Sequence, residues 1–187
     1  MTPEPSARAP QLLAFRSAAL TLWGTSAWQE IVDRLPAETR DALVVDGLVV
    51  AVGWVPERHL VKLAEAVHDG PAEGSPDAYR EFVAQVIALG FGRVRRLLVQ
   101  FAPPSAVLRR APELWRHDHT HGDLSVVERD AGATVHVNHE VLTSTPLSCA
   151  TCAEMFRAIT SLTRAKNVKE THFLERPGRL RVELEWE

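Results

Sequence analysis

The clearest pattern of hydrophobic and polar positions lies at the C-terminal end of the chain. Leucine, valine and tryptophan alternate with charged residues from Leu180 to Trp186, as in a strand with one buried face. A similar alternation begins near Leu124 and is interrupted by Asp130-Ala-Gly132, a turn signal. The alternation therefore predicts two β-hairpins, the second of which turns at Arg176-Pro-Gly178.

Hydrophobic residues three and four positions apart predict helices in most of the remaining chain. The longest such stripe runs from Tyr79 to Phe101, and another follows Pro146, between the two hairpins. Shorter helices are predicted before Pro36, over 37–43, after Pro56 and after Ser105. Residues 11–23 mix apolar and small residues without a helical period, so a strand is predicted there.

The order of these elements predicts an α+β fold. N-terminal helices would pack on an antiparallel sheet made by the hairpin–helix–hairpin part of the chain. Residues 1–10 hold three prolines and are predicted to be a disordered tail. Residues 11–187 are predicted to form a single α+β domain.

Composition narrows the functional class. The 187 residues are 45% hydrophobic and 24% charged, which argues against a disordered chain. The net charge of -3 argues against a nucleic-acid partner. No apolar run is long enough for a membrane span, and the first ten residues lack the apolar core of a secretory signal. We therefore expect a cytoplasmic protein.

Two short motifs could carry chemistry. His117, His119 and His121 alternate, so in an extended segment their rings share a face and could bind one zinc ion. The alternative is a solvated polar connection. Cys149 and Cys152 form a single CxxC on the apolar stripe of a predicted helix, where core packing is expected over a metal or redox role.

Scattered positions resemble a known family. They are Leu35-Pro36, Trp54-Val-Pro56, Leu60, Ala106, Pro112-Glu-Leu-Trp115, Gly122-Asp-Leu124, Pro146, Cys149 and Val182-Glu-Leu-Glu-Trp186. This order resembles a myxobacterial paralogous family of unknown function. That family is similar to four-vinyl-reductase-type domains and, more distantly, to haem nitric-oxide sensor domains and TRAPP subunits.

The resemblance implies a ligand-binding or assembly domain, often dimeric, with a cavity between helices and sheet. Four-vinyl-reductase-type sensors of aromatic compounds carry a cysteine-rich zinc site, and Cys149 resembles its first cysteine. The final hairpin contains no cysteine, in contrast to that family. Haem sensors need an axial histidine on one helix, and we assign none of the eight histidines to that role.

The hypothesis is a non-enzymatic regulatory or sensory domain without a cofactor that binds a small apolar ligand or a protein partner as a homodimer. The candidate ligand-binding residues are Trp54, Phe82, Val86, Leu98, Trp115, Met155 and Phe156. One alternative is a zinc-binding protein, such as a hydrolase, that uses His117, His119 and His121. Another is a structural assembly subunit.

Overall fold

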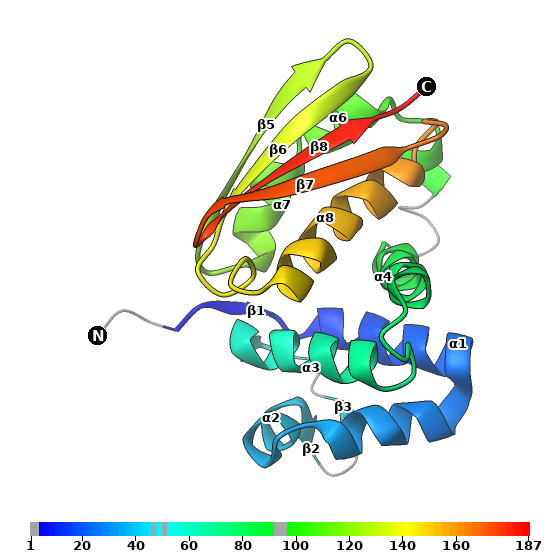
Figure 1. Ribbon diagram of the computed structural model, residues 1–187, viewed down its shortest axis with the longest axis vertical. Coiled ribbons are helices and arrows are strands. Elements are labelled where there is room, and N and C mark those ends of the chain that lie inside the picture. The colour runs from blue at the N-terminus through cyan, green and yellow to red at the C-terminus, as the bar shows by residue number, and fades with distance from the viewer. Residues whose placement is uncertain (1–3, 46–47, 50–51, 92–96) are drawn as a thin grey trace. The chain divides into compact units, whose positions relative to one another are not determined.

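The computed structural model describes residues 4–45, 48–49, 52–91 and 97–187 (Figure 1). The chain forms two compact units, Met1–Gly90 and Phe91–Glu187. Helices and antiparallel β-pairs are present in both units, which confirms the predicted α+β class.

The first unit consists mainly of helices. Its elements are β1 (Ser6–Arg8), α1 (Pro10–Arg34), α2 (Ala37–Leu43), β2 (Val44–Val45), β3 (Leu48–Val49), β4 (Trp54–Pro56), α3 (Glu57–Asp69) and α4 (Pro76–Gly90). Strand β1 lies within the predicted N-terminal tail and pairs with β4 in an antiparallel register. Helix α1 packs on α3 and α4.

The strand predicted over residues 11–23 is wrong, because these residues belong to α1. The buried face of this part of the helix consists of Leu12, Ala14, Ala18 and Ala19. Alanine favours a helix but adds little to a pattern of large hydrophobic residues, so the helical period is hidden in the sequence. The helix is interrupted at Gly24, whose φ of 82° lies in the left-handed region that glycine adopts readily.

Helix α4 begins close to the predicted position and ends earlier than predicted. It buries Tyr79, Phe82, Val83, Val86 and Ile87, the first part of the predicted stripe, and ends at Gly90. Part of the predicted continuation, residues 92–96, lies outside the described residues, and residues 97–100 are helical. Glycine destabilises helix interiors, which is consistent with an end at this position.

The second unit contains a four-stranded sheet and three helices of defined bounds. They are α6 (Pro104–Leu108), α7 (Ala111–Asp118), β5 (Asp123–Arg129), β6 (Gly132–Asn138), α8 (Pro146–Ser161), β7 (Lys169–Arg176) and β8 (Arg179–Glu185). The strand order is β5-β6-β8-β7, and all neighbours are antiparallel. Both predicted hairpins and the helix between them are confirmed.

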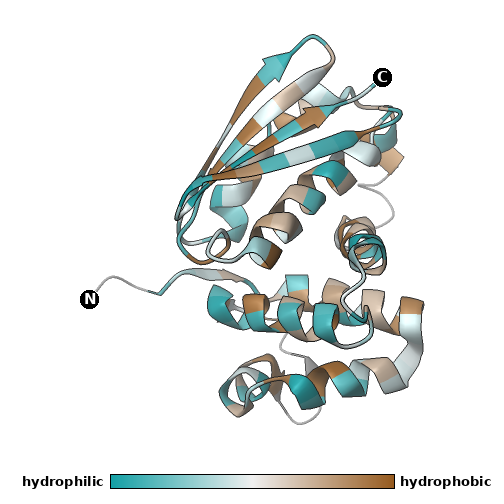
Figure 2. Cartoon of the chain, in the orientation of Figure 1, coloured by the Kyte–Doolittle hydropathy of each residue, from teal (hydrophilic) through white to brown (hydrophobic). Residues whose placement is uncertain are grey.

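One face of the sheet is apolar and carries the core of this unit. Alternate residues of the two central strands are fully buried: Ala133, Val135, Val137, Leu180, Val182 and Leu184. The alternation of hydrophobic and hydrophilic residues is visible along the strands (Figure 2). Helix α7 packs against β5, and α8 packs against β7 and β8.

Helix α8 begins at a complete capping box. The backbone N–H of Ser148 donates to Thr145 Oγ1 at 3.1 Å, and the backbone N–H of Thr145 donates to Ser148 Oγ at 3.0 Å. These bonds satisfy donors that would otherwise lack partners, while Pro146 occupies a first-turn position that needs no N–H. The start of the helix is therefore fixed by local sequence.

Candidate functional site

The seven predicted ligand-binding residues are divided between the two units. Trp54, Phe82 and Val86 lie in the first unit. Leu98, Trp115, Met155 and Phe156 lie in the second. The assignment of these residues to one binding site stays a prediction.

In the first unit, Phe82 is the centre of an aromatic cluster. Its ring stacks on Trp23 with centroids 5.5 Å apart and meets the edge of Phe15 at 5.6 Å. Tyr79 follows at 6.2 Å, and His68 makes an edge contact with Tyr79 at 5.5 Å. Because Phe82 is fully buried within these contacts, it already stabilises the packing of α1 on α4.

Two of the predicted residues are exposed in the described structure. The side chain of Trp54 is 47% exposed, with the Arg8 guanidinium 5.3 Å from its ring centroid. Leu98 is 70% exposed, and its neighbours Leu97 and Phe101 are also exposed. Large exposed apolar side chains that are close in sequence are typical of surfaces that contact a ligand or a partner.

The other three predicted residues of the second unit lie in or beside its core. Trp115 and Phe156 belong to the buried cluster, and Met155 is partly exposed. Methionine adapts its shape to different neighbours, so a partly exposed Met155 suits a variable contact.

Sequence patterns did not reveal a cluster of rings around Trp115. The ring of His119 stacks on Trp115 with centroids 4.1 Å apart, and His139 meets the edge of Trp115 at 5.8 Å. The indole N–H donates to the carbonyl of His121 at 3.2 Å. These contacts join α7 to the segments on either side of the β5–β6 hairpin.

His139 is a structural residue at the end of β6. It is 3% exposed, and its Nδ1 accepts the backbone N–H groups of Val141 and Leu142 at 3.2 and 3.1 Å. The hydroxyl of Thr143 donates to the His139 carbonyl. The imidazole thus orders the turn that leads to α8. Because the contributing residues are close only in space, no sequence spacing indicated this role.

The three predicted zinc ligands each contact a different neighbouring residue. His117 Nδ1 lies 2.8 Å from Asp118, His119 stacks on Trp115, and His121 Nδ1 lies 2.9 Å from Thr120 Oγ1. Among the residues that the structure describes, no three His, Cys, Asp or Glu side chains are arranged to hold a metal ion.

Both cysteines are buried free thiols on α8. Burial raises the pKa of Cys149, which favours the unreactive thiol. The Cys152 thiol lies 3.5 Å from the carbonyl of Leu142. These observations agree with the predicted core-packing role.

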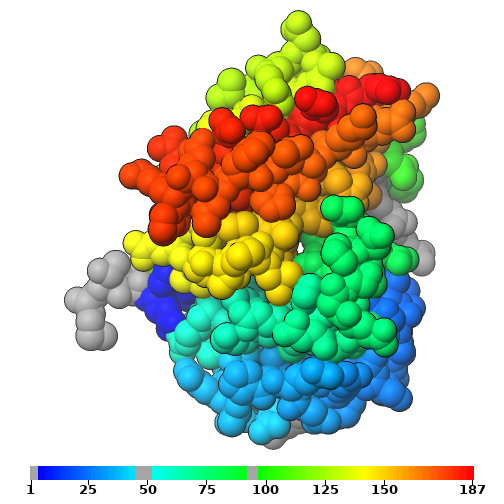
Figure 3. All heavy atoms as spheres, viewed as in Figure 1, coloured from blue at the N-terminus to red at the C-terminus, as the bar shows by residue number. Residues whose placement is uncertain are grey.

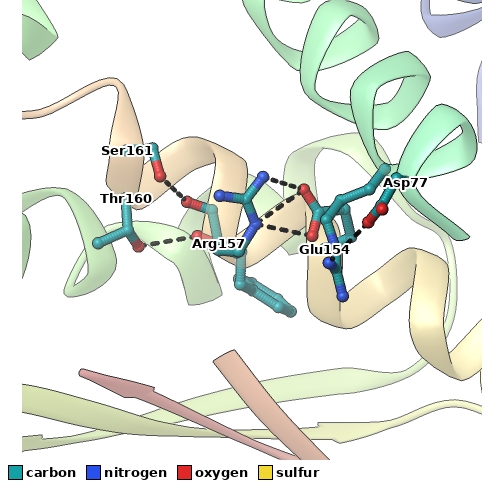
Figure 4. Close-up of polar contacts among 7 residues, drawn as sticks. Asp77, Glu154, Arg157, Thr160 and Ser161 are labelled. Atoms are coloured by element: carbon teal, nitrogen blue, oxygen red, sulfur yellow. Dashed lines mark hydrogen bonds and ion pairs between the residues drawn. The ribbon is translucent and has the colours of Figure 1, made fainter. Parts of the chain in front are cut away.

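An ion pair on α8 is a second feature that the sequence patterns did not reveal. Arg157 Nε donates to both carboxylate oxygens of Glu154, at 2.9 and 2.7 Å, as the close-up shows (Figure 4). The hydrogen bonds from Arg157 to Glu154 raise the pKa of Arg157. On β7, His172 Nδ1 lies 2.6 Å from Glu170, and Glu170 also acts on Arg157 through its charge. The side chains of Glu154 and Glu170 are buried.

Two depressions on the described surface are open to solvent. One, of about 740 Å³, lies along the second half of α1 and is lined by polar side chains such as Gln29 and Asp33. The other, of about 390 Å³, lies beside the β5–β6 turn and Trp186. Neither is lined by a predicted ligand-binding residue.

Comparison with known proteins gives a fold but no family. No protein-family model and no curated protein sequence matches the chain. The chain is similar to the solved structure of an unliganded Fe(II) H-NOX protein from K. algicida, with a TM-score of 0.66, 9% identity and 96% of both chains covered. An Fe(II)NO H-NOX protein from S. oneidensis gives a TM-score of 0.62 at 13% identity, covering 96% of this chain and 99% of that chain.

A third similar structure is described as modulating haem redox potential through protein-induced porphyrin distortion. Its TM-score is 0.65 at 11% identity, and it covers 96% of this chain and 95% of that chain. At these identities the likeness establishes the fold. The predicted resemblance to haem nitric-oxide sensors is therefore confirmed for the fold, because H-NOX denotes haem nitric oxide/oxygen binding. The resemblance to a myxobacterial paralogous family stays a prediction.

The cofactor expectation needs correction. The sequence patterns favour no cofactor, with zinc at His117, His119 and His121 as the alternative. That expectation is contradicted, because the similar structures are haem proteins and nothing in the comparison supports zinc.

Proposed function

We propose that this chain is a sensory domain that binds a small apolar ligand and does not catalyse a reaction. The observation that carries the proposal is the likeness to H-NOX structures over 96% of the chain. Support comes from the exposed apolar residues Trp54 and Leu98 and from the partly exposed Met155.

Haem is the first ligand to consider, because the similar structures contain it. Haem iron in proteins is held by His, Cys, Met or Tyr side chains. Outside the described residues, Met1 is the only residue of these types. The structure therefore describes every other candidate ligand of the chain.

Three of the buried candidates are poorly suited to iron. The Nδ1 atom of His139 accepts two backbone N–H groups, so its neutral ring carries the proton on Nε2 and has no lone pair there. Burial and the charge of Arg58 lower the pKa of His59, and its Nδ1 lies 3.0 Å from the Thr39 hydroxyl. Cys149 is held as a thiol, whereas a thiolate is the ligand form.

Three further histidines are accessible to solvent. In His68, His117 and His172 the Nδ1 atom faces a carboxylate, an arrangement that metal-ligating histidines often have. However, His117 is exposed, His68 and His172 are partly exposed, and neither open depression includes any of the three. We therefore assign none of these six residues as an axial ligand.

Two further features belong to the proposal. We place the protein in the cytoplasm, and we propose that it acts as a homodimer that transmits the bound state to a protein partner. Among the described residues, no helix is both long and apolar enough to cross a membrane.

A thermal-shift panel tests the function. The probes are haemin, metal-free protoporphyrin IX, aromatic compounds and fatty acids. We expect at least one to raise the melting temperature by about 5–10 °C at a hundredfold excess over its dissociation constant, because such binding adds about 2.7 kcal/mol to the folded state. A response to haemin but not to protoporphyrin would identify iron ligation.

A matched pair of variants tests the predicted residues. Leu98→Ala should weaken binding of the active probe, because it removes an exposed apolar contact. Leu174→Ala, on β7, is the control, since its side chain is also exposed and is not among the predicted residues. If no probe shifts the melting temperature, the sensory proposal fails, and the structural-assembly alternative replaces it.

A further inference from the structure

The sheet of the second unit has two edges of different character. At one edge, β7 contains a register shift between Leu174 and Arg176, a distortion that discourages further pairing. At the other, β5 pairs with β6 in unbroken register through all seven residues, Asp123–Arg129. Among the described strands, β6 is the only neighbour of β5. The outer edge of β5 is therefore a regular template for another strand (Figure 1).

We propose that β5 pairs with β5 of a second copy of this chain and joins the two sheets into one. The strand is complementary to itself in an antiparallel register centred on Val126. Asp123 then lies opposite Arg129 of the second copy, and Ser125 lies opposite its Val127. A two-fold axis creates each contact twice, as in an isologous dimer.

The side chains that would meet are accessible. Asp123, Ser125, Val127 and Arg129 lie on one face of β5, and all four are exposed. Opposite charges directly across a strand pair stabilise it, whereas like charges destabilise it. The opposite charges at the two ends of β5 therefore favour this register. Atoms of β7 and β8 are visible at the surface of the same sheet (Figure 3).

The local bonds of the two charged residues are compatible with this pairing. Asp123 Oδ1 accepts from Asn138 Nδ2 at 2.7 Å, and its second oxygen adds further acceptor capacity. Arg129 Nη2 makes two long contacts, 3.5 Å to the Ala133 carbonyl and 3.4 Å to the Leu184 carbonyl. These contacts hold the guanidinium toward β6 and β8, so the Arg129 side chain must turn toward the outer edge of β5 before its remaining donors can meet a carboxylate of the second copy.

Helix α7 supplies a second contact. It packs against β5, and the two-fold axis of an antiparallel strand pair places both copies of α7 on the same side of the joined sheet. Leu114 on this helix is 46% exposed. Apolar contact between the two α7 helices would reduce that exposure and add to the strand pairing.

A charge swap tests the pairing. Light scattering over a range of micromolar concentrations should give about twice 20.7 kDa for the full chain. Asp123→Arg alone and Arg129→Asp alone should each raise the dimer dissociation constant by at least about tenfold, because each places like charges opposite one another twice. The double variant restores opposite charges and should recover most of the affinity.

Asp130→Arg is the matched control, because it makes the same charge change in the turn beyond β5 and should leave dimerisation intact. Circular dichroism confirms that each variant is folded. A monomeric wild-type chain, a double variant that is folded but not restored, or an equal effect of Asp130→Arg would overturn the proposal. Ligand binding does not enter this test, so its failure is distinct from failure of the sensory function.

Discussion

Gly122 leaves no room for a side chain beside the imidazole of His139. A Cβ at residue 122 would lie 2.5 Å from His139 Cδ2 and 2.7 Å from the Asn138 carbonyl oxygen. The φ of Gly122 is also positive, at 76°. This close approach holds the start of β5 against the residue that orders the turn before α8.

Gly122→Ala should therefore destabilise the protein. The substitution adds a steric clash to the strain of a positive φ, so we expect a loss of about 2–4 kcal/mol in the free energy of unfolding. Urea denaturation measures it. Gly178→Ala is the control, because Gly178 has a φ of 82° and a Cβ there would meet nothing within 4 Å, so strain alone should cost about 1–2 kcal/mol. Equal losses for the two variants would contradict the packing relationship.

The hairpins could be predicted from the sequence, because a strand with one buried face alternates hydrophobic and polar residues within its own segment. The sequence pattern missed the first half of α1, residues 11–23, whose buried face depends on alanines that add little to a hydrophobic pattern, whereas the helix predicted before Pro36 is the second half of α1. It also missed the role of His139, because the ring of Trp115, the backbone near Gly122 and the turn at Val141 meet it only in the folded chain. Local patterns revealed elements, whereas side-chain clusters required the tertiary structure.

His59 should make stability depend on pH. Burial and the nearby Arg58 lower its pKa in the folded state below the ordinary value of 6.5, so the unfolded chain binds the proton more tightly. The contribution of His59 is then fully present above pH 6.5 and is lost as the pH falls below it. His59→Gln should show a smaller decrease in unfolding free energy between about pH 7 and pH 5. Parallel curves for variant and wild type would exclude this effect.

The two cysteines should be unreactive in the folded protein. A thiol reagent at neutral pH should label Cys149 and Cys152 slowly in buffer and rapidly in denaturant, because both thiols are buried. Cys152→Ser should lower the free energy of unfolding by about 1–3 kcal/mol, since it places a hydroxyl among apolar groups. Rapid labelling of both thiols in the native state would show that the core position is wrong.

The Glu154–Arg157 pair should contribute to stability through its buried carboxylate. Arg157→Met removes the bidentate partner of Glu154 and should cost about 2–4 kcal/mol. Glu154→Gln combined with Arg157→Met removes the charge as well, so the double variant should be less destabilised than Arg157→Met alone. Thermal unfolding at constant pH compares them, and a double variant less stable than the single variant would refute this explanation.

The central claim, that the chain is a sensory domain for an apolar ligand, is tested most directly by titrating the strongest thermal-shift probe and following tryptophan fluorescence. The five tryptophans include Trp54 and Trp115, two of the predicted ligand-binding residues. We predict a saturable change with one ligand per chain and an affinity that Leu98→Ala weakens and Leu174→Ala does not. A change that never saturates with any probe in the panel would contradict the claim.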